Sequence, residues 1–542
     1  MRVLLVYPSF PNTYWGFAHS LPLIQKRASL PPLGLISVAA LLPQDWDMRV
    51  VDMNVEPLES SQLEWADVVL VSGMLVQEES MHDVLARARQ RGVRTVVGGP
   101  GCTTSPERFD DADCLFLGEA EERVDELIAA VEGRPGSPRI LPAPTARPSL
   151  HAVPVPRFDL LAIEHYRSMC VQTSRGCPFN CEFCDIIEIY GRVPRVKRPE
   201  QITAELEALH RLGHRGDIFV VDDNFIGNKK LVRPILTAMA KWQGEKLYPF
   251  TFYTEASLNL AADDKLIEAM RQADFTSVFI GIETPDPVAL KHTGKTQNVG
   301  VDVSAALEKL TAAGLEVMAG FIVGFDGDGP ESFEAQRSLL EDAPLPLAMV
   351  GLLIALPSTK LWRRLEREGR LRDHSDGDAF ARPNFRPTMP ERELVAGYAK
   401  LLASLYTPEA YYRRSTAVVE RLGARAHKAP LHAKDVVIAL RSLYSLGVQS
   451  PRRALFWPLL ARAIPRGTHV IRSAIACAIR GEHMIRYTQE VVLPRLALAL
   501  IEIDAGIEGA VKTEAAVEGA PRHRSLPLVD ALLEPRLRLV EH

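Results

Sequence analysis

Three cysteines lie within eight residues near the middle of the chain, in the segment VQTSRGCPFNCEFCDI. Their spacing is Cys177-x-x-x-Cys181-x-x-Cys184. A loop with this spacing can fold three thiolates around one iron–sulfur cube and leave the fourth iron without a protein ligand. The sequence therefore predicts a cluster whose open iron binds a substrate or a cofactor.

Two other uses of clustered cysteines fit the sequence less well. A structural zinc site takes four protein ligands, and no second Cys or His pair follows at the spacing of a zinc finger. A disulfide framework is typical of short secreted chains with an even number of cysteines, whereas this chain has 542 residues and seven cysteines. We therefore favour the iron–sulfur cluster.

Length and charge indicate a multidomain protein that acts on small molecules. A chain of 542 residues with 47% hydrophobic and 24% charged residues is long enough for two or three cores. The net charge of −5 and the lack of a basic arm argue against a nucleic-acid partner. The start of the chain reads as an apolar strand rather than a signal peptide, which predicts a cytoplasmic protein. No apolar run is long enough to span a bilayer, so membrane contact would be peripheral.

Residues 1–130 alternate short apolar runs with helical patterns. We expect strands at residues 3–7, 49–52, 68–72, 95–98 and 114–117, and helices such as 33–42 and 79–91. This alternation predicts a parallel sheet covered on both faces, with ligands beyond the carboxyl ends of the strands. Small and polar residues occupy those ends: Asn54, Ser72, Gly73, Met74, Gly98, Gly99, Pro100, Gly118 and Glu119. Glycines there let a bulky ligand approach the backbone, although glycines after a strand are more often only a turn.

Residues 131–165 are rich in proline and predict a linker between domains, because proline continues neither a helix nor a central strand. From 166 to 388 the alternation resumes, with strands expected at 169–173, 217–221, 250–254, 277–282, 316–323 and 348–355. Helices such as 199–212 and 302–313 separate them. Six such units in series predict a complete or partial barrel, in which chemistry gathers at the C-terminal strand ends. The cysteine loop follows the first of these strands.

Residues 389–503 predict an amphipathic, arginine-rich helical domain. The ordinary interpretation is a cap packed on the barrel mouth with its charges outward. The alternative is a basic, aromatic-bearing surface that contacts a membrane and admits a lipid. Residues 504–542 predict a loose tail with a short helix at 528–538.

The cysteine triad, with Phe183 directly before its last member, resembles the signature of the radical S-adenosylmethionine superfamily. The resemblance implies that Cys177, Cys181 and Cys184 bind a 4Fe-4S cluster, whose free iron chelates the amino and carboxylate groups of S-adenosylmethionine. Further residues at the barrel strand ends would hold the rest of that molecule: Asp222, Asp223, Glu255, Glu283, Gly320 and Gly324.

The roles of these strand-end residues follow from the same resemblance. Asp222 and Asp223 resemble the family's element for the methionyl amino group, and Glu283 resembles its ribose-binding position. The two glycines would let the adenine lie against backbone. Glu255 is a departure, because some relatives place a basic residue there for the methionyl carboxylate. For each carboxylate the alternative is an N-cap or a solvated turn.

The N-terminal region, fused ahead of the cysteine loop, resembles the cobalamin-binding domain of cobalamin-dependent radical S-adenosylmethionine enzymes. Its landmarks are the glycines and proline of residues 98–100 and the Leu-Gly-Glu of residues 117–119. The pattern Asp-x-His-x-x-Gly of many other cobalamin domains is absent, so cobalt would lack a histidine from that motif. The nucleotide tail would lie near Ser72 and Gly98, and the lower cobalt face would meet residues 74–77. A flavodoxin-like domain kept only for structure is the alternative.

Taken together, the chain resembles the cobalamin-dependent, class B radical S-adenosylmethionine methyltransferases with a helical C-terminal domain, a subgroup that includes hopanoid C-2 methylases. The resemblance implies a Rossmann-like domain, a partial (β/α)6 barrel, and methylation of an unactivated carbon of a small molecule or lipid. An external donor of the flavodoxin or ferredoxin type would reduce the cluster, a 5'-deoxyadenosyl radical would abstract hydrogen, and methylcobalamin would supply the methyl group. A cobalamin-assisted cyclase or rearrangement enzyme and a non-catalytic cobalamin or redox sensor remain as alternatives.

Overall fold

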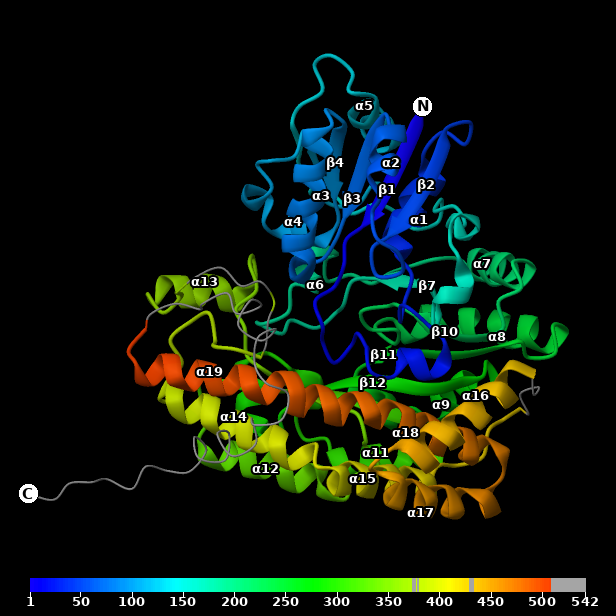
Figure 1. Cartoon of the computed structure of the whole chain (residues 1–542), viewed down its shortest axis with the longest axis vertical. Coiled ribbons are helices and arrows are strands. Elements are labelled where there is room, and N and C mark those ends of the chain that lie inside the picture. The colour runs from blue at the N-terminus through cyan, green and yellow to red at the C-terminus, as the bar shows by residue number, and fades with distance from the viewer. Residues whose placement is uncertain (373–376, 378–379, 428–432, 508–542) are drawn as a thin grey trace, which may run out of the picture.

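The computed structural model describes residues 1–372, 377, 380–427 and 433–507. Figure 1 shows an N-terminal sheet at the top, a second sheet below it, and the C-terminal helices across the lower part of the molecule. The short helix expected at 528–538 lies outside the described residues. No described helix combines the length and the apolar character needed to cross a membrane.

The N-terminal sheet is parallel throughout, as predicted, with the strand order β2-β1-β3-β4-β5-β6. Its strands are β1 (Arg2–Tyr7), β2 (Asp47–Asp52), β3 (Val68–Ser72), β4 (Arg94–Gly98), β5 (Cys114–Phe116) and β6 (Ile140–Leu141). Successive residues of β1 enter different cores, Leu4 one and Leu5 the other, because side chains alternate between the faces of a strand. Both faces of the sheet are therefore covered.

The helices of this region connect the parallel strands. They are α1 (Leu33–Leu41), α2 (Ser60–Trp65), α3 (Glu78–Gln90), α4 (Pro100–Thr104) and α5 (Val124–Glu132), with the 3-10 turns η1 (Leu21–Ile24), η2 (Leu75–Gln77) and η3 (Pro106–Arg108). Beyond α5 the proline-rich segment contains the turns η4 (Phe158–Leu160) and η5 (Ile163–His165). The same segment also contributes β6, whose Leu141 carbonyl accepts a hydrogen bond from the backbone of Leu117 at 2.9 Å. The expected linker thus supplies the edge strand of the sheet.

The second sheet is a six-stranded parallel sheet with the order β14-β13-β12-β11-β10-β7. Its strands are β7 (Met169–Val171), β10 (Gly216–Val220), β11 (Phe250–Ala256), β12 (Phe275–Glu283), β13 (Glu316–Val323) and β14 (Ala348–Leu352), and a short hairpin joins β8 (Ser174–Arg175) to β9 (Arg195–Val196). The outer strands β7 and β14 do not pair, so the predicted incomplete barrel is confirmed. The strand expected at 169–173 ends two residues early, because the backbone N–H of Thr173 binds the Asp222 carboxylate instead of a neighbouring strand.

Most helices of the partial barrel lie between successive strands, and the last helix follows the last strand. They are α6 (Ile186–Ile189), α7 (Pro199–Arg211), α8 (Lys229–Glu245), α9 (Asp264–Gln272), α10 (Pro287–His292), α11 (Val303–Ala312), α12 (Pro330–Glu341) and α13 (Lys360–Arg367), with the 3-10 turns η6 (Leu258–Ala262) and η7 (Thr296–Asn298). Asp263 and Asp302 cap the N-termini of α9 and α11 by accepting backbone hydrogen bonds at 3.0 Å.

The C-terminal region is helical, as predicted. It consists of α14 (Glu391–Leu405), α15 (Pro408–Arg421), α16 (Ala433–Tyr444), α17 (Arg453–Ala463), α18 (Thr468–Tyr487) and α19 (Leu493–Asp504), with the π-helical turns η8 (Ser445–Gln449) and η10 (Thr488–Val492) and the 3-10 turn η9 (Ile464–Arg466). Tyr398 lies on α14 and Tyr406 directly follows it. Their hydroxyls donate hydrogen bonds to the carbonyls of Val350 and Ala348 on β14, at 2.8 and 2.6 Å. The helices therefore cover the open edge of the sheet, which would otherwise present unpaired backbone groups.

We expected these helices to cap the barrel mouth, and their contacts correct that expectation. Besides the β14 edge, they contact Glu316, whose carboxylate pairs with Arg480 of α18. Glu316 is the first residue of β13 and lies at the end of the sheet opposite to the cysteine loop. Hydrogen-bonding groups on a strand edge and a buried carboxylate at the strand start both require partners, and α14 and α18 provide them.

Residues 8–28 leave the N-terminal sheet and pack against the C-terminal helices. The Tyr14 hydroxyl lies 2.5 Å from the Thr488 hydroxyl, and the Ser20 hydroxyl donates to the carbonyl of Ile479 at 2.6 Å. Tyr14 and Phe17 belong to the same apolar core as the barrel strands and α18. The N-terminal segment therefore joins all three regions, which the local sequence pattern did not indicate.

Candidate active site

The cysteine loop lies at the C-terminal end of the second sheet, immediately after β7 and β8. Cys181 is buried, Cys177 and Cys184 are partly buried, and none of the three forms a disulfide. The side-chain amides of Asn224 and Gln297 lie 3.8 Å from the sulfurs of Cys177 and Cys181. Such donors stabilise thiolates, so the loop has the donor set that an iron–sulfur cluster requires.

The thiols do not converge on one point. Among the described residues, no group of three or more His, Cys, Asp or Glu side chains could hold a single metal ion. A 4Fe-4S cube, in which four irons alternate with four sulfides, takes each thiolate on a different iron and needs no single shared centre. The three cysteines and their amide donors fit such a cluster.

Close backbone contacts hold the loop on both sides. Gly176 has a φ of 93°, and a Cβ at this position would lie 2.8 Å from the carbonyl oxygen of Gly191. A side chain is excluded there, both by the backbone conformation and by the space. On the other side, the N–H of Glu182 donates to the carbonyl of Thr293 at 2.8 Å. The cysteines are thus held on a backbone with little freedom.

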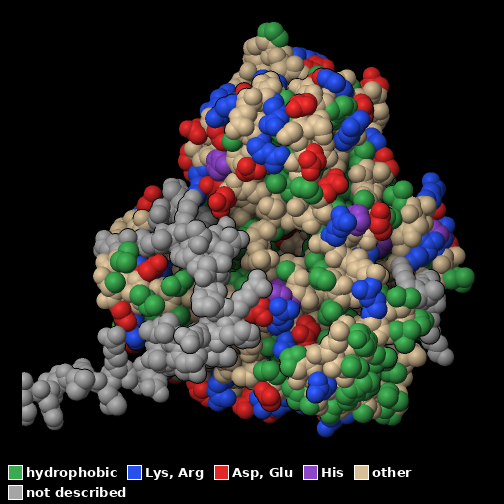
Figure 2. All heavy atoms as spheres, in the orientation of Figure 1, with side chains coloured by type: hydrophobic (Ala, Val, Ile, Leu, Met, Phe, Trp, Pro, Cys, Tyr) green, Lys and Arg blue, Asp and Glu red, His purple; other side chains and the backbone are tan. Residues whose placement is uncertain are grey.

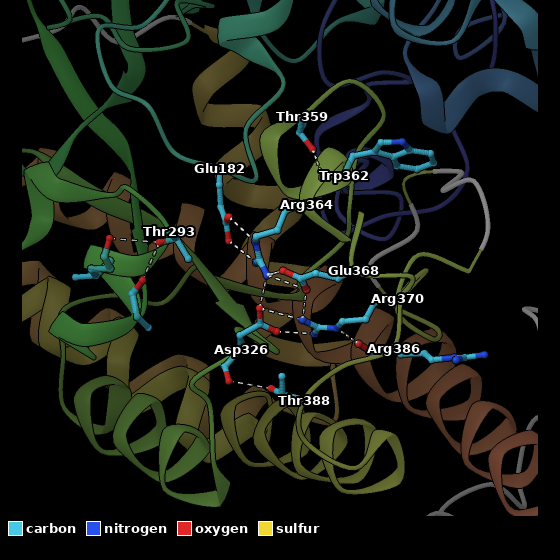
Figure 3. Close-up of polar contacts among 12 residues, drawn as sticks. Glu182, Thr293, Asp326, Thr359, Trp362, Arg364, Glu368, Arg370, Arg386 and Thr388 are labelled. Carbon is cyan, nitrogen blue, oxygen red and sulfur yellow. Dashed lines mark hydrogen bonds and ion pairs between the residues drawn. The ribbon is translucent and has the colours of Figure 1, made fainter. Parts of the chain in front are cut away.

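Glu182 also anchors the loop through its side chain, as Figure 3 shows. Its carboxylate accepts two hydrogen bonds from Arg364 of α13, at 3.1 and 2.9 Å. Arg364 also donates to Asp326 at 2.6 Å, and Asp326 accepts a second bond at 2.6 Å from Arg370. Bidentate arginine–carboxylate pairs fix orientation as well as distance. The loop after β13 and the helix α13 are therefore tied to the residue between two of the cysteines.

The two adjacent carboxylates after β10, Asp222 and Asp223, differ in how many hydrogen bonds they accept from the protein. Asp222 is buried and accepts hydrogen bonds from the Thr173 backbone at 2.7 Å, from the Thr173 hydroxyl and from Ser174 Oγ at 2.7 Å. Asp223 accepts one bond, at 3.1 Å, from the N–H of Gly176. Burial raises the pKa of Asp223 to about 7, against the opposing effect of that bond. Asp222 thus shapes the turn before the cysteines, and Asp223 keeps capacity for a ligand.

Glu255 and Glu283 come from β11 and β12 and face the same buried region. Burial, reinforced by the charge of Asp223, raises the pKa of Glu255 to about 8. Glu283 pairs with Lys295, with 2.5 Å between its oxygen and the ammonium nitrogen. Burial alone would lower the pKa of Lys295, but the Glu283 carboxylate raises it above its ordinary value. The carboxylates outnumber the single ammonium, which suits a cationic ligand.

The two expected glycines lie on β13 and directly after it. A Cβ on Gly320 would lie 3.1 Å from the ring of Phe279, so this glycine makes room for an aromatic side chain of β12. Gly324 has a φ of 102°, and its N–H donates to Asp328 at 2.7 Å. Gly320 therefore adjoins the barrel interior, while the backbone of Gly324 is engaged in a turn.

On the N-terminal sheet, the structure brings together the predicted residues at the ends of β3 and β4. Gly99 has a φ of 90°, and a Cβ there would lie 2.3 Å from Ser72 Oγ. The N–H of Gly101 binds the carbonyl of Gly73 at 3.0 Å. A Cβ on Gly98 would meet only the carbonyl oxygen of Phe116, at 3.5 Å, so the space around Gly98 is open. These residues, with Pro100 as the first residue of α4, form a compact backbone surface that fits a close-lying ligand.

The remaining predicted residues of this sheet separate into different environments. The Asn54 amide is used locally, since it accepts from Phe10 and donates to Asp52, both at 2.8 Å. Met74 is half exposed, and its backbone N–H is held by Gln77 at 2.9 Å. Gly118 has a φ of 80° and lies against Ala143 of the proline-rich segment. Met74 is therefore the available side chain of this group.

Glu119 connects the two sheets. Its buried carboxylate pairs with Arg175 at 2.8 Å and with Arg195 at 2.9 Å, and Arg175 also pairs with Glu121 at 2.8 Å. Arg175 precedes Cys177 by two residues, so the end of the N-terminal sheet is bonded directly to the cysteine loop. Helix α4 contacts α6, which follows that loop. Figure 2 shows a hollow between the N-terminal region and the rest of the molecule on this side.

The sequence pattern missed Arg175, Arg195 and Lys295. All three are charged side chains that are largely buried, with between 12 and 14% of each side chain exposed. Lys295 follows α10 rather than a strand, and the two arginines face each other across the two-residue strands β8 and β9. A search restricted to long strand ends passes over such positions. One sequence signal could have indicated two of them, because Arg175 and Lys295 each lie next to a glycine, Gly176 and Gly294.

Three family models match consecutive parts of the chain. A B12 binding domain matches residues 24–128, the radical SAM superfamily matches residues 171–340, and a domain of unknown function (DUF4070) matches residues 359–494. These ranges correspond to the N-terminal sheet, the partial barrel and the C-terminal helices. A chain with the first two matches uses a 4Fe-4S cluster, S-adenosylmethionine and cobalamin.

Named relatives match over nearly the whole chain. An uncharacterized methyltransferase of Synechocystis sp. is 40% identical over 497 residues, which cover 90% of this chain and 92% of the relative. The hopanoid C-2 methylase of Rhodopseudomonas palustris is 35% identical over 502 residues, which cover 90% of this chain and 94% of the relative.

Solved structures show the same fold. The radical S-adenosylmethionine methyltransferase TsrM from Kitasatospora setae, with cobalamin and a 4Fe-4S cluster bound, has a TM-score of 0.59 and 17% identity, covering 87% of this chain and 98% of its own. The cobalamin-dependent S-adenosylmethionine radical enzyme OxsB has a TM-score of 0.57 and 16% identity, covering 98% of this chain and 83% of its own. From its domain order and its methyltransferase relatives, this chain belongs to the cobalamin-dependent radical S-adenosylmethionine methyltransferases, in the subgroup that includes the hopanoid C-2 methylases.

Proposed function

We propose that this methyltransferase acts on an apolar lipid of the hopanoid type. The observation that carries the proposal is the aromatic lining of the barrel interior. Residues of β12 alternate, so that Val278 and Ile280 enter the main core while Phe279 faces the other side of the strand. Phe219 and Tyr253 stack with 4.8 Å between their centroids, and Trp15 lies 5.0 Å from Phe279. An interior of this kind favours an apolar substrate.

The 35% identity with a hopanoid C-2 methylase supports the same substrate class. When bound, the cluster with S-adenosylmethionine and the cobalamin supply the radical chemistry that removes a hydrogen from an unreactive carbon and the methyl group that replaces it. The protein's part is to hold these groups at a fixed separation and to keep water away from them.

We assign the protein's residues to these tasks as follows. Cys177, Cys181 and Cys184 hold the cluster. Asp223 and Glu255 face the cationic groups of S-adenosylmethionine, and Glu283, oriented by Lys295, accepts hydrogen bonds from ribose hydroxyls. At the other sheet, the backbone of residues 98–100 with Ser72 and Gly73 would hold the cobalamin tail, and the half-exposed Met74 would contact the cobalamin. The ion pair of Arg175 with Glu119 holds the residues assigned to the cluster and those assigned to cobalamin at a fixed position relative to each other.

Two partners follow from this chemistry. A bound cluster would supply one electron to S-adenosylmethionine, so the protein would need an external one-electron donor of the flavodoxin or ferredoxin type. A lipid substrate is stored in a bilayer, so the enzyme must work at the periphery of a membrane. Both partners belong to the proposal.

The test is anaerobic incubation of the reconstituted protein with a hopanoid lipid fraction, a chemical reductant and S-adenosylmethionine carrying a trideuterated methyl group. We expect mass spectrometry to find a lipid that has gained one trideuteromethyl group, with S-adenosylhomocysteine and 5'-deoxyadenosine as co-products. The Cys177→Ala variant is the matched control and should give none of these. Formation of 5'-deoxyadenosine without a labelled lipid would exclude this substrate class.

A further inference from the structure

A continuous apolar surface occupies the outer side of α16, η8 and α17. Six large apolar side chains on these elements are between 47 and 62% exposed: Val436, Val437, Leu440, Tyr444, Val448 and Trp457. In Figure 2 hydrophobic side chains gather at the lower right, where Figure 1 draws these helices. Apolar side chains exposed singly need no explanation, but a contiguous group of this kind marks an interaction site.

The spacing of these residues makes them one surface. Val436, Leu440, Tyr444 and Val448 recur every four residues and so lie on one face of α16 and its π-helical continuation. Trp457 of α17 joins them, because its indole N–H donates to the carbonyl of Gly447 at 3.0 Å. Gly447 leaves room for this contact, since a Cβ there would lie 2.7 Å from the indole ring. We call this set of six residues the α16–α17 surface.

Positive charge surrounds the α16–α17 surface. From residue 436 to residue 472 the chain carries six arginines and no Asp or Glu, although the whole protein has a net charge of −5. Two of the six, Arg452 and Arg462, pair with Glu482 and Glu420. Arg441 and Arg453 are exposed on the same helices and form no ion pair among the described residues. A basic rim around an apolar surface that includes Trp and Tyr is the pattern of an interfacial membrane site.

We propose that the α16–α17 surface docks the protein on a bilayer that contains anionic lipids. The inserted side chains would be the six apolar residues, and Arg441 and Arg453 would contact lipid phosphates. This inference rests on the proposed lipid substrate for its purpose, but its physical basis is the surface itself. A protein partner or a second copy would also bury apolar side chains, but neither explains why Arg441 and Arg453 stand beside this surface of an acidic protein without an ion pair in the part of the chain that the structure describes.

The surface is also connected to the barrel interior. Helix α16 packs against η1 in the N-terminal segment. Six residues before η1, Trp15 of the same segment contacts Phe279, which faces the barrel interior. The segment from residue 15 to residue 24 therefore lies between the proposed bilayer contact and the aromatic lining. A lipid that leaves the bilayer at α16 would meet this segment on its way to the interior.

Vesicle flotation of the full chain tests the inference. The probes are vesicles of phosphatidylcholine alone and of phosphatidylcholine with phosphatidylglycerol, at low and at high salt. We expect the protein to float with the anionic vesicles and to be released by salt. Leu440→Glu and Val437→Glu should lower the bound fraction at least about tenfold, because a buried carboxylate opposes insertion into the apolar layer. Arg441→Glu should remove the dependence on phosphatidylglycerol.

The matched control is Leu231→Glu on α8, because Leu231 is 46% exposed but lies outside the α16–α17 surface. This variant should float like the unaltered protein. The absorbance of the reconstituted cluster confirms that each variant is folded. Absence of flotation with anionic vesicles, or equal flotation of the surface variants, would overturn the inference. So would a dimer that Leu440→Glu dissociates in the absence of vesicle binding.

The outcome is separate from that of the proposed reaction. Flotation needs neither substrate nor reductant, so a protein that floats but methylates no lipid would contradict the proposed substrate and not the surface. A protein that methylates a detergent-dispersed lipid but does not float would contradict the surface and the proposed membrane contact, and not the substrate.

Discussion

The Glu119 carboxylate lies 2.8 Å from the Arg175 guanidinium, and both side chains are nearly buried. Glu119 ends the loop after β5 of the N-terminal sheet, and Arg175 precedes the first cysteine by two residues. The pair therefore joins the two regions that match the cobalamin and radical domains. Arg175 also donates two hydrogen bonds to the carboxylate of Glu121, at 3.0 and 2.8 Å, which fixes the orientation of its guanidinium. Reaction between two cofactors requires a fixed separation, and this buried set of charged side chains supplies it.

Replacement of Arg175 by Met should destabilise the protein strongly. The substitution leaves Glu119 with Arg195 alone and removes the arginine that pairs with Glu121. Loss of one member of a buried ion pair costs about 3–5 kcal/mol. Denaturant unfolding measures the change. The control Arg157→Met breaks an exposed pair with Asp159 and should cost no more than about 1 kcal/mol.

Lys295 should act through Glu283. Lys295→Met leaves the Glu283 carboxylate buried without its ammonium partner, so we expect a loss of about 3 kcal/mol and weaker binding of S-adenosylmethionine. The double variant Lys295→Met/Glu283→Gln should recover part of the stability, because no buried charge is left unpaired. Binding, followed by isothermal titration, should stay weak in the double variant. Unchanged affinity in Glu283→Gln would contradict the ribose-binding role.

The three loop cysteines should be equivalent in a cluster assay and different from other buried cysteines. Cys177→Ala, Cys181→Ala and Cys184→Ala should each lose most of the iron and acid-labile sulfide and all measurable cleavage of S-adenosylmethionine. Cys170→Ala is the control, because Cys170 is buried on β7 only seven residues before the first ligand. It should keep its iron content. Loss of the cluster in Cys170→Ala alone would contradict the assignment.

His483 should make the stability of the protein sensitive to acid. It is buried on α18, and its two ring nitrogens face the carbonyl of Thr13 at 3.1 Å and the N–H of His19 at 3.5 Å. Only the neutral ring, protonated at Nε2, satisfies both. Burial lowers the pKa of His483 to about 4, with a smaller contribution from His19.

Since the folded-state pKa of His483 lies below its ordinary value of 6.5, protonation favours the unfolded chain. Its contribution to stability is complete above about pH 6.5 and is lost as the pH falls from there toward about 4. The full effect is roughly 3 kcal/mol. His483→Asn should flatten the dependence of unfolding free energy on pH in this window. The exposed His151, changed to Asn, should leave the dependence as it is.

Much of the architecture could be predicted from periodicity alone. Apolar runs such as residues 68–72 coincide with strands, because a strand buried on both faces is apolar at every position. The cysteine spacing alone indicated an iron–sulfur cluster, whereas S-adenosylmethionine and cobalamin were expected from the resemblance to a known family. The two-residue strand β6 was missed, because it lies among prolines and pairs only at the sheet edge.

The site residues were harder to assign, because the sequence shows which side chains stand at strand ends but not what they bind there. Asn54 and Asp222 were expected to bind cofactors, but in the structure both side chains form hydrogen bonds within the protein. Lys295 was missed, since its partner Glu283 lies across a short helix. Such pairs form between residues brought together by the tertiary fold, and the hydrophobic periodicity of the sequence does not indicate them.

The contact between Tyr14 and Thr488 spans 474 positions of the sequence. A ribosome makes the N-terminal sheet first, whereas the partners of residues 12–20 on α18 and η10 emerge near the end of synthesis. During translation this early segment therefore waits without its final neighbours, with Tyr14 and Phe17 uncovered. Packing of the last helices over this segment completes the fold. A chain truncated within α18 should therefore expose these apolar side chains and aggregate.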